Sequence, residues 1–240
     1  MNCASFDFLQ RAIDYLFPAL CIVCDKPRPR DERWLCGECE IALIENYRNR
    51  DPCPRCAVNR AFGPCQCRDG FDFPFDRAYS FFDFDAPVRS VLHHVKYRGK
   101  KRLAFDLALR FARLATPDFF DGINGVVAVP LHSSRRRKRG YNQADYLARG
   151  VAEAKTLPLF DGIIERIRKT ATQTSLNRRS RRKNMIGAFA VPSGSSARIQ
   201  GATLLLIDDV MTTGSTTGAA AQALLHAGAV SVRVLSFARD

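Results

Sequence analysis

Two adjacent carboxylates, Asp208 and Asp209, follow directly after four aliphatic residues at positions 204–207. A short turn rich in hydroxyl groups and glycine comes next, at residues 212–217, and an alanine-rich stretch follows it. This order predicts a buried parallel strand, a tight loop and the start of a helix, whose free N–H groups and positive dipole end bind phosphate. The two acids would then hold the hydroxyl groups of a sugar attached to that phosphate. The segment therefore indicates a sugar-phosphate site.

Other phosphate motifs do not describe this segment. It lacks the Gly-Lys-Ser/Thr ending of a Walker loop and the GxGxxG pattern of a dinucleotide-binding turn. A core strand followed by a helix with an Asp or Thr cap would show part of the same pattern, and that alternative stays open. The aliphatic run, the double acid and the Thr-Thr-Gly-Ser-Thr turn occur together, which favours the phosphate site.

Eight of the nine cysteines lie between residues 21 and 67, in spaced pairs. Two residues between thiolates let both face one ion, and two such pairs complete a tetrahedral site of four thiolates, which is typical of structural zinc. Prolines and glycines predict turns rather than long helices in this region. The last pair is separated by one residue only, so we expect one or two zinc ions. The expected ligands are Cys21, Cys24, Cys36 and Cys39 in the first set and Cys53, Cys56, Cys65 and Cys67 in the second.

The compartment expected for this chain is the cytoplasm. The first twenty residues carry Asp7, Arg11 and Asp14 where a secretory signal would be apolar. No run approaches the roughly 18 apolar residues of a membrane span. A reducing compartment favours metal binding over disulfides for spaced cysteines.

Positive charge belongs to the second part of the chain. Residues 1–75 contain 10 Lys and Arg against 11 Asp and Glu, whereas residues 76–240 contain 27 against 13. The basic residues concentrate at 135–139 and 178–183, with five in each segment. Such density exceeds what solubility requires and suits an anionic partner such as nucleic acid or pyrophosphate. The change of charge coincides with the expected boundary between a cysteine-rich module at 1–75 and a larger domain at 76–240.

The elements that must position these residues alternate between strands and helices. Apolar runs predict strands at residues 78–84, 126–130, 163–167, 188–191, 204–207 and 231–237, and helices at 6–17, 87–96, 103–115, 142–154 and 215–227. Such alternation predicts an α/β fold with a doubly wound parallel sheet. Ligands of these sheets bind beyond the carboxyl ends of the strands, where both Pro130 and Asp208 are expected.

Residues 207–216, Ile-Asp-Asp-Val-Met-Thr-Thr-Gly-Ser-Thr, resemble the phosphoribosyl-pyrophosphate (PRPP) motif of type I phosphoribosyltransferases. Three further segments, at 94–103, 126–147 and 173–189, and the cysteine-rich start complete a wider resemblance. Together they make the whole chain similar to the ComF family, competence-associated proteins with a phosphoribosyltransferase-like domain and a zinc-finger head.

This resemblance implies roles for particular residues. Asp208 and Asp209 would hold the ribose hydroxyls and, with Lys96, form the catalytic group. The loop around the 5′-phosphate would comprise Val210, Met211, Thr212, Thr213, Gly214, Ser215 and Thr216. The pyrophosphate loop would comprise Leu131, His132, Ser133, Arg135 and Arg139, and a lid at 168–185 would contribute Gln173, Arg178 and Arg182. Mg²⁺ would accompany PRPP. For Asn142, a helix cap and a ligand contact both stay open.

Two functional hypotheses follow. The favoured one is a PRPP-binding, phosphoribosyltransferase-like protein of DNA uptake and natural transformation, which handles single-stranded DNA and contacts proteins of the uptake machinery. The alternative is an active phosphoribosyltransferase with an unidentified nitrogenous acceptor. The cysteine-rich segment replaces the base-binding hood of that class, which argues against ordinary salvage chemistry.

Overall fold

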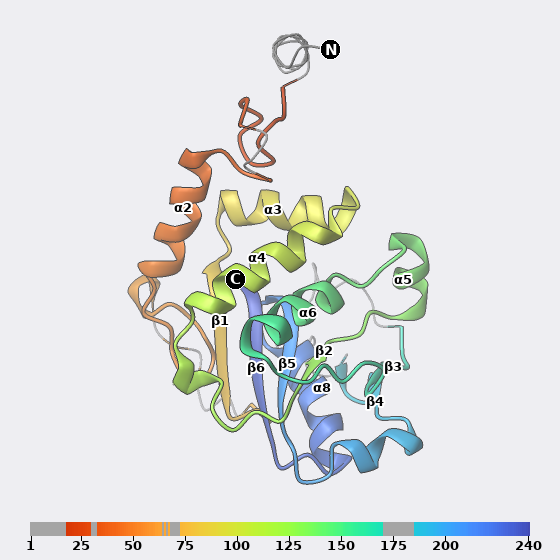
Figure 1. Cartoon of the computed structure of the whole chain (residues 1–240). Helices are drawn as coiled ribbons and strands as arrows, with labels where there is room; N and C mark the ends of the chain where they lie inside the picture. Colours follow the sequence, from red (N-terminus) through yellow and green to blue (C-terminus); the bar gives the residue numbers. More distant parts are fainter. Residues whose placement is uncertain (1–17, 30–32, 64, 66, 68–72, 170–184) are drawn as a thin grey trace.

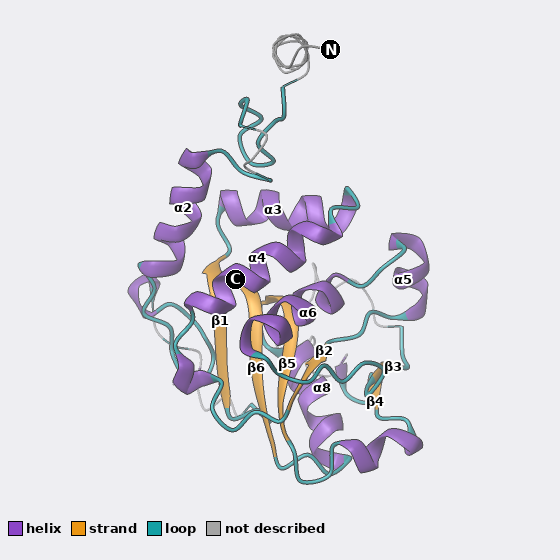
Figure 2. Cartoon of the chain, viewed as in Figure 1, coloured by secondary structure: helices purple, strands orange, loops and turns teal. Residues whose placement is uncertain are grey.

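A computed structural model describes residues 18–29, 33–63, 65, 67, 73–169 and 185–240. A four-stranded sheet forms its centre, in the order β1-β6-β5-β2, and every neighbouring pair is parallel (Figures 1 and 2). The strands are β1 (Arg77–Asp83), β2 (Gly125–Ala128), β5 (Thr203–Met211) and β6 (Ser231–Arg239). The α/β fold with a parallel sheet that the sequence predicts is confirmed.

Helices cover both faces of this sheet, as expected for a doubly wound fold. The helices α3 (Ala86–Tyr97), α4 (Lys101–Leu114) and α6 (Gln143–Lys155) share one apolar core with Leu205 and Ile207. On the opposite face, α8 (Ser215–His226) packs against Leu204 and Leu206. Successive residues of a strand point to opposite faces, so a strand covered on both sides must be apolar throughout. This requirement explains the unbroken aliphatic run of β5.

Four features differ from the predicted elements. The basic loop is a short helix, α5 (Ser133–Arg139), and the cysteine-rich region contains the twelve-residue helix α2 (Gly37–Arg48), although turns were expected there. The strand β5 continues through the acidic pair to Met211 instead of ending at residue 207. Finally, β3 (Glu165–Arg166) and β4 (Phe189–Ala190) form a separate antiparallel pair and do not join the parallel sheet. The remaining elements are the short 3₁₀ helices η1 (Arg60–Phe62), η3 (Pro117–Phe119) and η5 (Ser193–Arg198).

The cysteine-rich segment packs directly on the sheet. The helix α2 contacts β1 and α3. Arg50, whose side chain is 2% exposed, pairs with Asp83 at 3.0 Å and donates to the backbone oxygens of Ser80 and Ala57. Such a buried guanidinium needs several acceptors, and here both the sheet and the cysteine-rich segment supply them.

The helix expected at residues 6–17 lies outside the described residues. No helix in the described part of the chain has both the length and the apolar character needed to cross a membrane.

Candidate functional site

The acidic pair lies inside the last part of β5. Asp208 pairs in register with Ser236 of β6, and both acids are buried, at 8% and 7% exposure. Because successive side chains of a strand alternate, the two carboxylates reach different surroundings. Asp209 contacts α3 and α6, whereas Asp208 lines the loop that leads into α8. The sequence predicts one role for both acids, but the structure gives each its own partners.

Asp209 is held by donors from three elements. Its Oδ2 atom accepts from Lys96 Nζ at 2.7 Å and from Gln143 Nε2 at 2.9 Å, and its Oδ1 atom accepts from the backbone N–H of Val210 at 2.7 Å. The guanidinium of Arg139 in turn donates to Oε1 of Gln143. We call Lys96, Asp209, Gln143 and Arg139 the Asp209 network. Because Oδ2 already has two donors, little of Asp209 is left for a ligand.

Gln143 is the member of this network that was not among the predicted site residues. It is 4% exposed and lies in the first turn of α6. Its position requires a neutral group that accepts from Arg139 on one side and donates to Asp209 on the other, and a carboxamide does both. The Gly-Tyr-Asn-Gln segment at 140–143 was the only signal in the sequence. The neighbouring Asn142 caps α6, since its side chain accepts from the backbone N–H of Ala144.

The two carboxyl groups have opposite shifts in pKa. Burial raises the pKa of Asp209, but the charge and hydrogen bond of Lys96 outweigh burial and hold that pKa below its usual range. Burial lowers the pKa of Lys96, and Asp209 outweighs this effect so that the pKa is raised. Asp208 has no ion pair within the described part of the chain; burial and then the charge of Asp209 raise its pKa well above the usual range, against the weaker effect of Lys96. A ligand that brings hydrogen-bond donors or positive charge would therefore gain the most binding free energy at Asp208.

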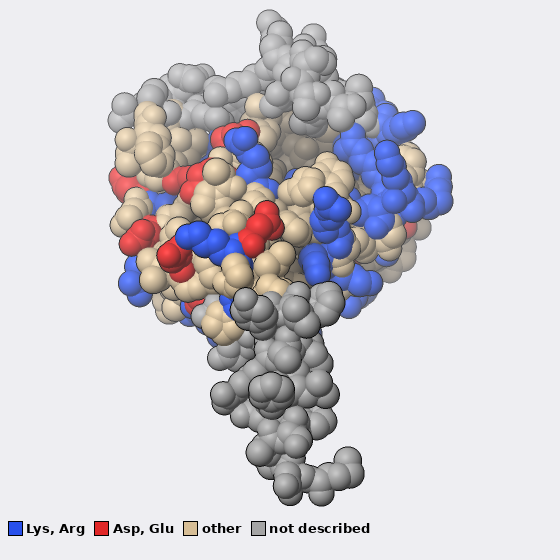
Figure 3. Space-filling view, turned by 90° about the horizontal axis from the view of Figure 1, so that it is seen from above, with Lys and Arg blue, Asp and Glu red and all other residues tan. Residues whose placement is uncertain are grey.

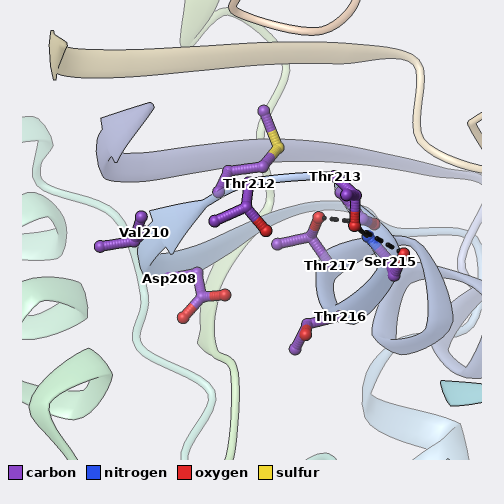
Figure 4. Close-up of a pocket in the computed structure, with 9 residues that line it drawn as sticks. Asp208, Val210, Thr212, Thr213, Ser215, Thr216 and Thr217 are labelled. Atoms are coloured by element: carbon purple, nitrogen blue, oxygen red, sulfur yellow. Dashed lines mark hydrogen bonds between the residues drawn. The ribbon is translucent and has the colours of Figure 1, made fainter. Parts of the chain in front are cut away.

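The loop after Asp208 forms a shallow cradle lined by hydroxyl groups (Figure 4). The hydroxyls of Thr213 and Ser215 bond each other at 2.7 Å, and that of Thr217 donates to the Gly214 oxygen at 3.1 Å. The first N–H groups of α8 have no acceptor within the helix and point out of its N-terminus. The space inside the loop is only about 10 Å³. A sugar phosphate would therefore lie across the opening of the cradle, with its phosphate at the N-terminus of α8.

Gly214 is required by the shape of this loop. Its φ of +72° is a conformation that residues with a side chain rarely adopt, and an added Cβ would lie 2.6 Å from the ring of Phe73. The ring of Phe73 therefore supports the phosphate cradle from the side of the cysteine-rich segment. The other predicted loop residues, Val210, Met211, Thr212 and Thr216, line the same cradle.

The predicted pyrophosphate loop follows the carboxyl end of β2. Leu131 and His132 lead into α5, and His132 begins this helix by accepting from the backbone N–H of Ser134. Ser133 and Arg135 are exposed, whereas Arg139 turns back to Gln143. Lys and Arg side chains gather on the side of the molecule that α5 occupies (Figure 3). The predicted lid residues Gln173, Arg178 and Arg182 lie outside the described residues.

Both predicted cysteine sets come together. In each set the four sulfur atoms lie within 4.8 Å of one another, which is a geometry that could hold a metal ion. The Sγ–Sγ distances include 3.6 Å between Cys24 and Cys36 and 3.9 Å between Cys53 and Cys67. A tetrahedral ion with metal–sulfur bonds of about 2.3 Å would place its ligands about 3.8 Å apart. In the second set, Cys65 lies closer than this to Cys56 and Cys53, at 3.3 and 3.1 Å, and all four sulfur atoms are still near enough to one another to hold one ion.

Removing metal should destabilise the chain. Structural metal supplies folding free energy directly, and each kcal/mol corresponds to about 2–4 °C in a chain of this size, so we expect a chelator to lower the unfolding midpoint by about 10 °C or more. Elemental analysis of the purified chain should find close to two ions, and Cys56→Ser should lose one. Cys3→Ser, outside both sets, is the matched control and should lose none. Fewer than one ion per chain would contradict the metal assignment.

Comparisons with known proteins identify relatives along nearly the whole chain. No family model matches. The DNA utilization protein YhgH of Salmonella typhimurium is 31% identical over 234 residues, which cover 92% of this chain and 97% of that protein. Competence protein F of Haemophilus influenzae is 34% identical over 114 residues, 48% of this chain and 49% of that protein. Competence protein ComFC of Streptococcus pneumoniae is 26% identical over 218 residues, 87% and 89% of the two chains.

Among solved structures, glutamine PRPP amidotransferase from B. subtilis covers 56% of this chain and 26% of its own, with 18% identity and a TM-score of 0.38. A superposition this loose adds nothing to the fold assignment, which rests on the parallel sheet itself. The sequence relatives are more informative, because the similarity to YhgH extends through both the cysteine-rich segment and the sheet. The chain therefore belongs to the ComF family.

Proposed function

We propose that the protein binds PRPP at the carboxyl ends of β2 and β5 and acts in DNA uptake, where it handles single-stranded DNA. The observation that carries the first part is the position of the Asp208 carboxylate beside the N-terminus of α8. Within the described residues this carboxylate accepts one backbone N–H, from Asp209 at 2.8 Å, and has acceptor capacity left for a ligand. A ligand that presents hydroxyls and a phosphate within one small molecule satisfies both groups at once. Membership of a family whose relatives are named for DNA utilization and competence supports the second part.

Each part of PRPP has a matching group in this proposal. The 5′-phosphate lies on the N–H groups and hydroxyls of residues 212–217, and the ribose hydroxyls donate to Asp208. The pyrophosphate lies toward Leu131, Ser133 and the basic helix α5, whose guanidinium groups suit phosphate oxygens. Mg²⁺ bound with PRPP would neutralise part of the charge of the pyrophosphate. Asp209 acts through Lys96, since the network holds that ammonium at the edge of the site.

The proposed DNA surface comprises α5 and Tyr97. Arg135, Arg136, Arg137 and Lys138 are exposed along α5. The ring of Tyr97 is 68% exposed, and the guanidinium of Arg139 lies 5.5 Å from its centroid. Backbone phosphates would contact the basic side chains, and one base could stack on the ring, as in single-strand binding proteins. The neighbouring Tyr141 is not part of this surface, because its hydroxyl donates to the backbone oxygen of Val95.

Turnover is the alternative within the same site. Lys96 lies beside two buried acids, and a protein that only binds PRPP would not need such a group. Its presence favours a transferase that acts on a nitrogenous acceptor. Release of pyrophosphate from PRPP in the presence of an acceptor would distinguish a transferase from a protein that only binds PRPP.

Three further assignments belong to this proposal. The ions of the two cysteine sets are zinc, because four thiolates in a closed tetrahedral set are typical of structural zinc sites. The chain divides near residue 75 into a zinc module and a phosphoribosyltransferase-like domain. The protein acts in the cytoplasm. Its proposed partners are PRPP, single-stranded DNA and proteins of the uptake machinery.

Calorimetric titration of PRPP with Mg²⁺ into the zinc-loaded chain tests the pocket. We expect saturable binding, and Asp208→Asn should weaken it at least about tenfold, because an amide replaces the charged acceptor of the ribose hydroxyls. Asp121→Asn changes an exposed carboxylate at the other end of the sheet and should leave the affinity unchanged. Absence of binding by folded wild-type protein would contradict the PRPP assignment.

Fluorescence anisotropy with a labelled oligothymidylate tests the DNA surface. Affinity should fall steeply between about 50 and 200 mM salt, and Arg135→Glu with Arg137→Glu should reduce the slope of log affinity against log salt by about 1–2. Arg48→Glu with Arg113→Glu reverses two exposed charges on α2 and α4 and should have little effect. If the affinity is flat across that range of salt, phosphate contacts do not hold the strand.

A further inference from the structure

A second cavity of about 560 Å³ lies on the outer side of β2 and shares no lining residue with the phosphate cradle. Its floor is the edge of β2, one wall is formed by α5 and α6, and the other by residues 160–166. A volume of this size is typical of small-molecule sites. Its charged groups are acids and arginines in mixture, including Asp145, Arg136 and Arg149. Such a lining suits a ligand that has both donors and acceptors.

The floor of the cavity offers an unpaired backbone edge. The N–H of Val129 donates to Ile207 at 2.8 Å, so the odd-numbered residues of β2 face β5. The even-numbered Val126 faces outward and exchanges two hydrogen bonds with residues 158 and 160, at 2.8 Å each. The chain then turns away at Asp161 and Gly162. The outward N–H and C=O of Ala128, the next even residue, therefore have no hydrogen-bond partner within the described part of the chain and line the cavity.

Asp145 supplies a fixed carboxylate on the wall. Its Oδ1 atom accepts from Nδ2 of Asn142 at 2.6 Å, and the same amide nitrogen donates to the backbone oxygen of Val129 at 3.1 Å. Asn142 is 3% exposed, so this contact orients the acid rigidly. Burial raises the pKa of Asp145, against the hydrogen bond from Asn142 and the charge of Arg136. A ligand with N–H donors would replace the hydration that burial removes.

The mouth of the cavity carries positive charge. Arg136 of α5 and Arg149 of α6 both line it, and the side chain of Arg149 is 52% exposed and only loosely paired with Asp161, at 3.7 Å. Both guanidinium groups can reach a phosphate while a flat ring occupies the interior. The cavity thus combines an edge amide, a carboxylate and phosphate-binding groups.

We propose that this cavity is a binding site for a guanine nucleotide. Guanine is the standard base with two adjacent N–H donors on its pairing edge, N1–H and N2–H, and a carboxylate such as Asp145 accepts both. The backbone N–H of Ala128 donates to a ring acceptor, and the arginines at the mouth hold the phosphate. The guanine comes either from a free nucleotide or from a residue of a bound strand, and both sources present the same chemistry. The cavity borders the proposed pyrophosphate loop, since Leu131 and Ser133 also line it, but it includes neither Asp208 nor residues 210–217 of the phosphate cradle. The inference goes beyond the function proposed above.

Titration of deoxynucleoside monophosphates into the full, zinc-loaded chain tests this assignment. We expect dGMP to bind at least about tenfold more tightly than dAMP, dCMP or dTMP, since a base without both N–H donors leaves part of the acceptor capacity of Asp145 unused. Deoxyinosine monophosphate lacks only the N2 amine and should lose about tenfold relative to dGMP. This comparison needs no variant and so does not depend on the folding of a mutant. Equal affinity for all of these nucleotides, or no binding of any, would overturn the proposal.

Variants then locate the binding and identify the source of guanine. Asp145→Asn should remove the preference for dGMP, whereas Glu153→Gln, on the outer side of the same helix, should keep it. Asp208→Asn should impair PRPP binding and leave dGMP binding unchanged, so failure of one assignment is distinguishable from failure of the other. A single guanine in an oligothymidylate should raise strand affinity if the strand is the source; if it does not while dGMP binds, the ligand is a free nucleotide. Retention of the dGMP preference by Asp145→Asn would contradict the site.

Discussion

The buried ion pair between Lys96 and Asp209 is the interaction on which the site depends. Asp209 lies inside a sheet covered on both faces, where an isolated carboxylate would be strongly destabilising. The ammonium of Lys96, at 2.7 Å, compensates for it, and Gln143 adds a second donor to the same oxygen. This pairing fixes α3 and the start of α6 against β5. Asp208 has no such ion pair within the described residues and lines the loop that leads into α8, so the neighbouring carboxylates have different surroundings.

The cysteine-rich segment supports the same edge of the sheet. Arg239, at the end of β6, donates to the backbone oxygen of Cys56 at 3.0 Å and to that of Met211 at 2.9 Å, so one guanidinium joins a cysteine set to the end of β5. Phe73 packs against Gly214 in the phosphate cradle. A metal ion in the second cysteine set would therefore stabilise the loop that receives the phosphate, although it has no open position for a substrate. This placement gives the cysteine-rich segment a structural role at the end of β5 and in the loop that follows it.

The sequence predicts those features that depend on continuous patterns. Each strand of the parallel sheet appears as an apolar run, because burial on both faces removes polar residues, and the cysteine sets follow from their spacing alone. The helix α5 escaped prediction because five consecutive basic residues carry no apolar periodicity, while its limits are set by the cap at His132 and by Gly140, whose φ is +82°. The helix α2 was missed although the prolines of the region lie outside it. The role of Gln143 could not be predicted, since it arises where segments distant in sequence meet at Asp209.

A double-mutant cycle on Lys96 and Asp209 tests the central claim most directly. Urea unfolding at pH 7 should show that Lys96→Met and Asp209→Asn each destabilise the chain by about 3 kcal/mol, because each leaves a buried charge or polar group without its partner. Asp208→Asn is the matched control. Because folding raises the pKa of Asp208, its ionised form opposes folding as the pH rises through that pKa. This variant should therefore be as stable as wild type or more stable. If the two residues act as a pair, the double variant Lys96→Met/Asp209→Asn should recover at least about 2 kcal/mol of the summed losses. Additive losses, within about 0.5 kcal/mol, would show that the two residues do not act as a pair and would contradict the account.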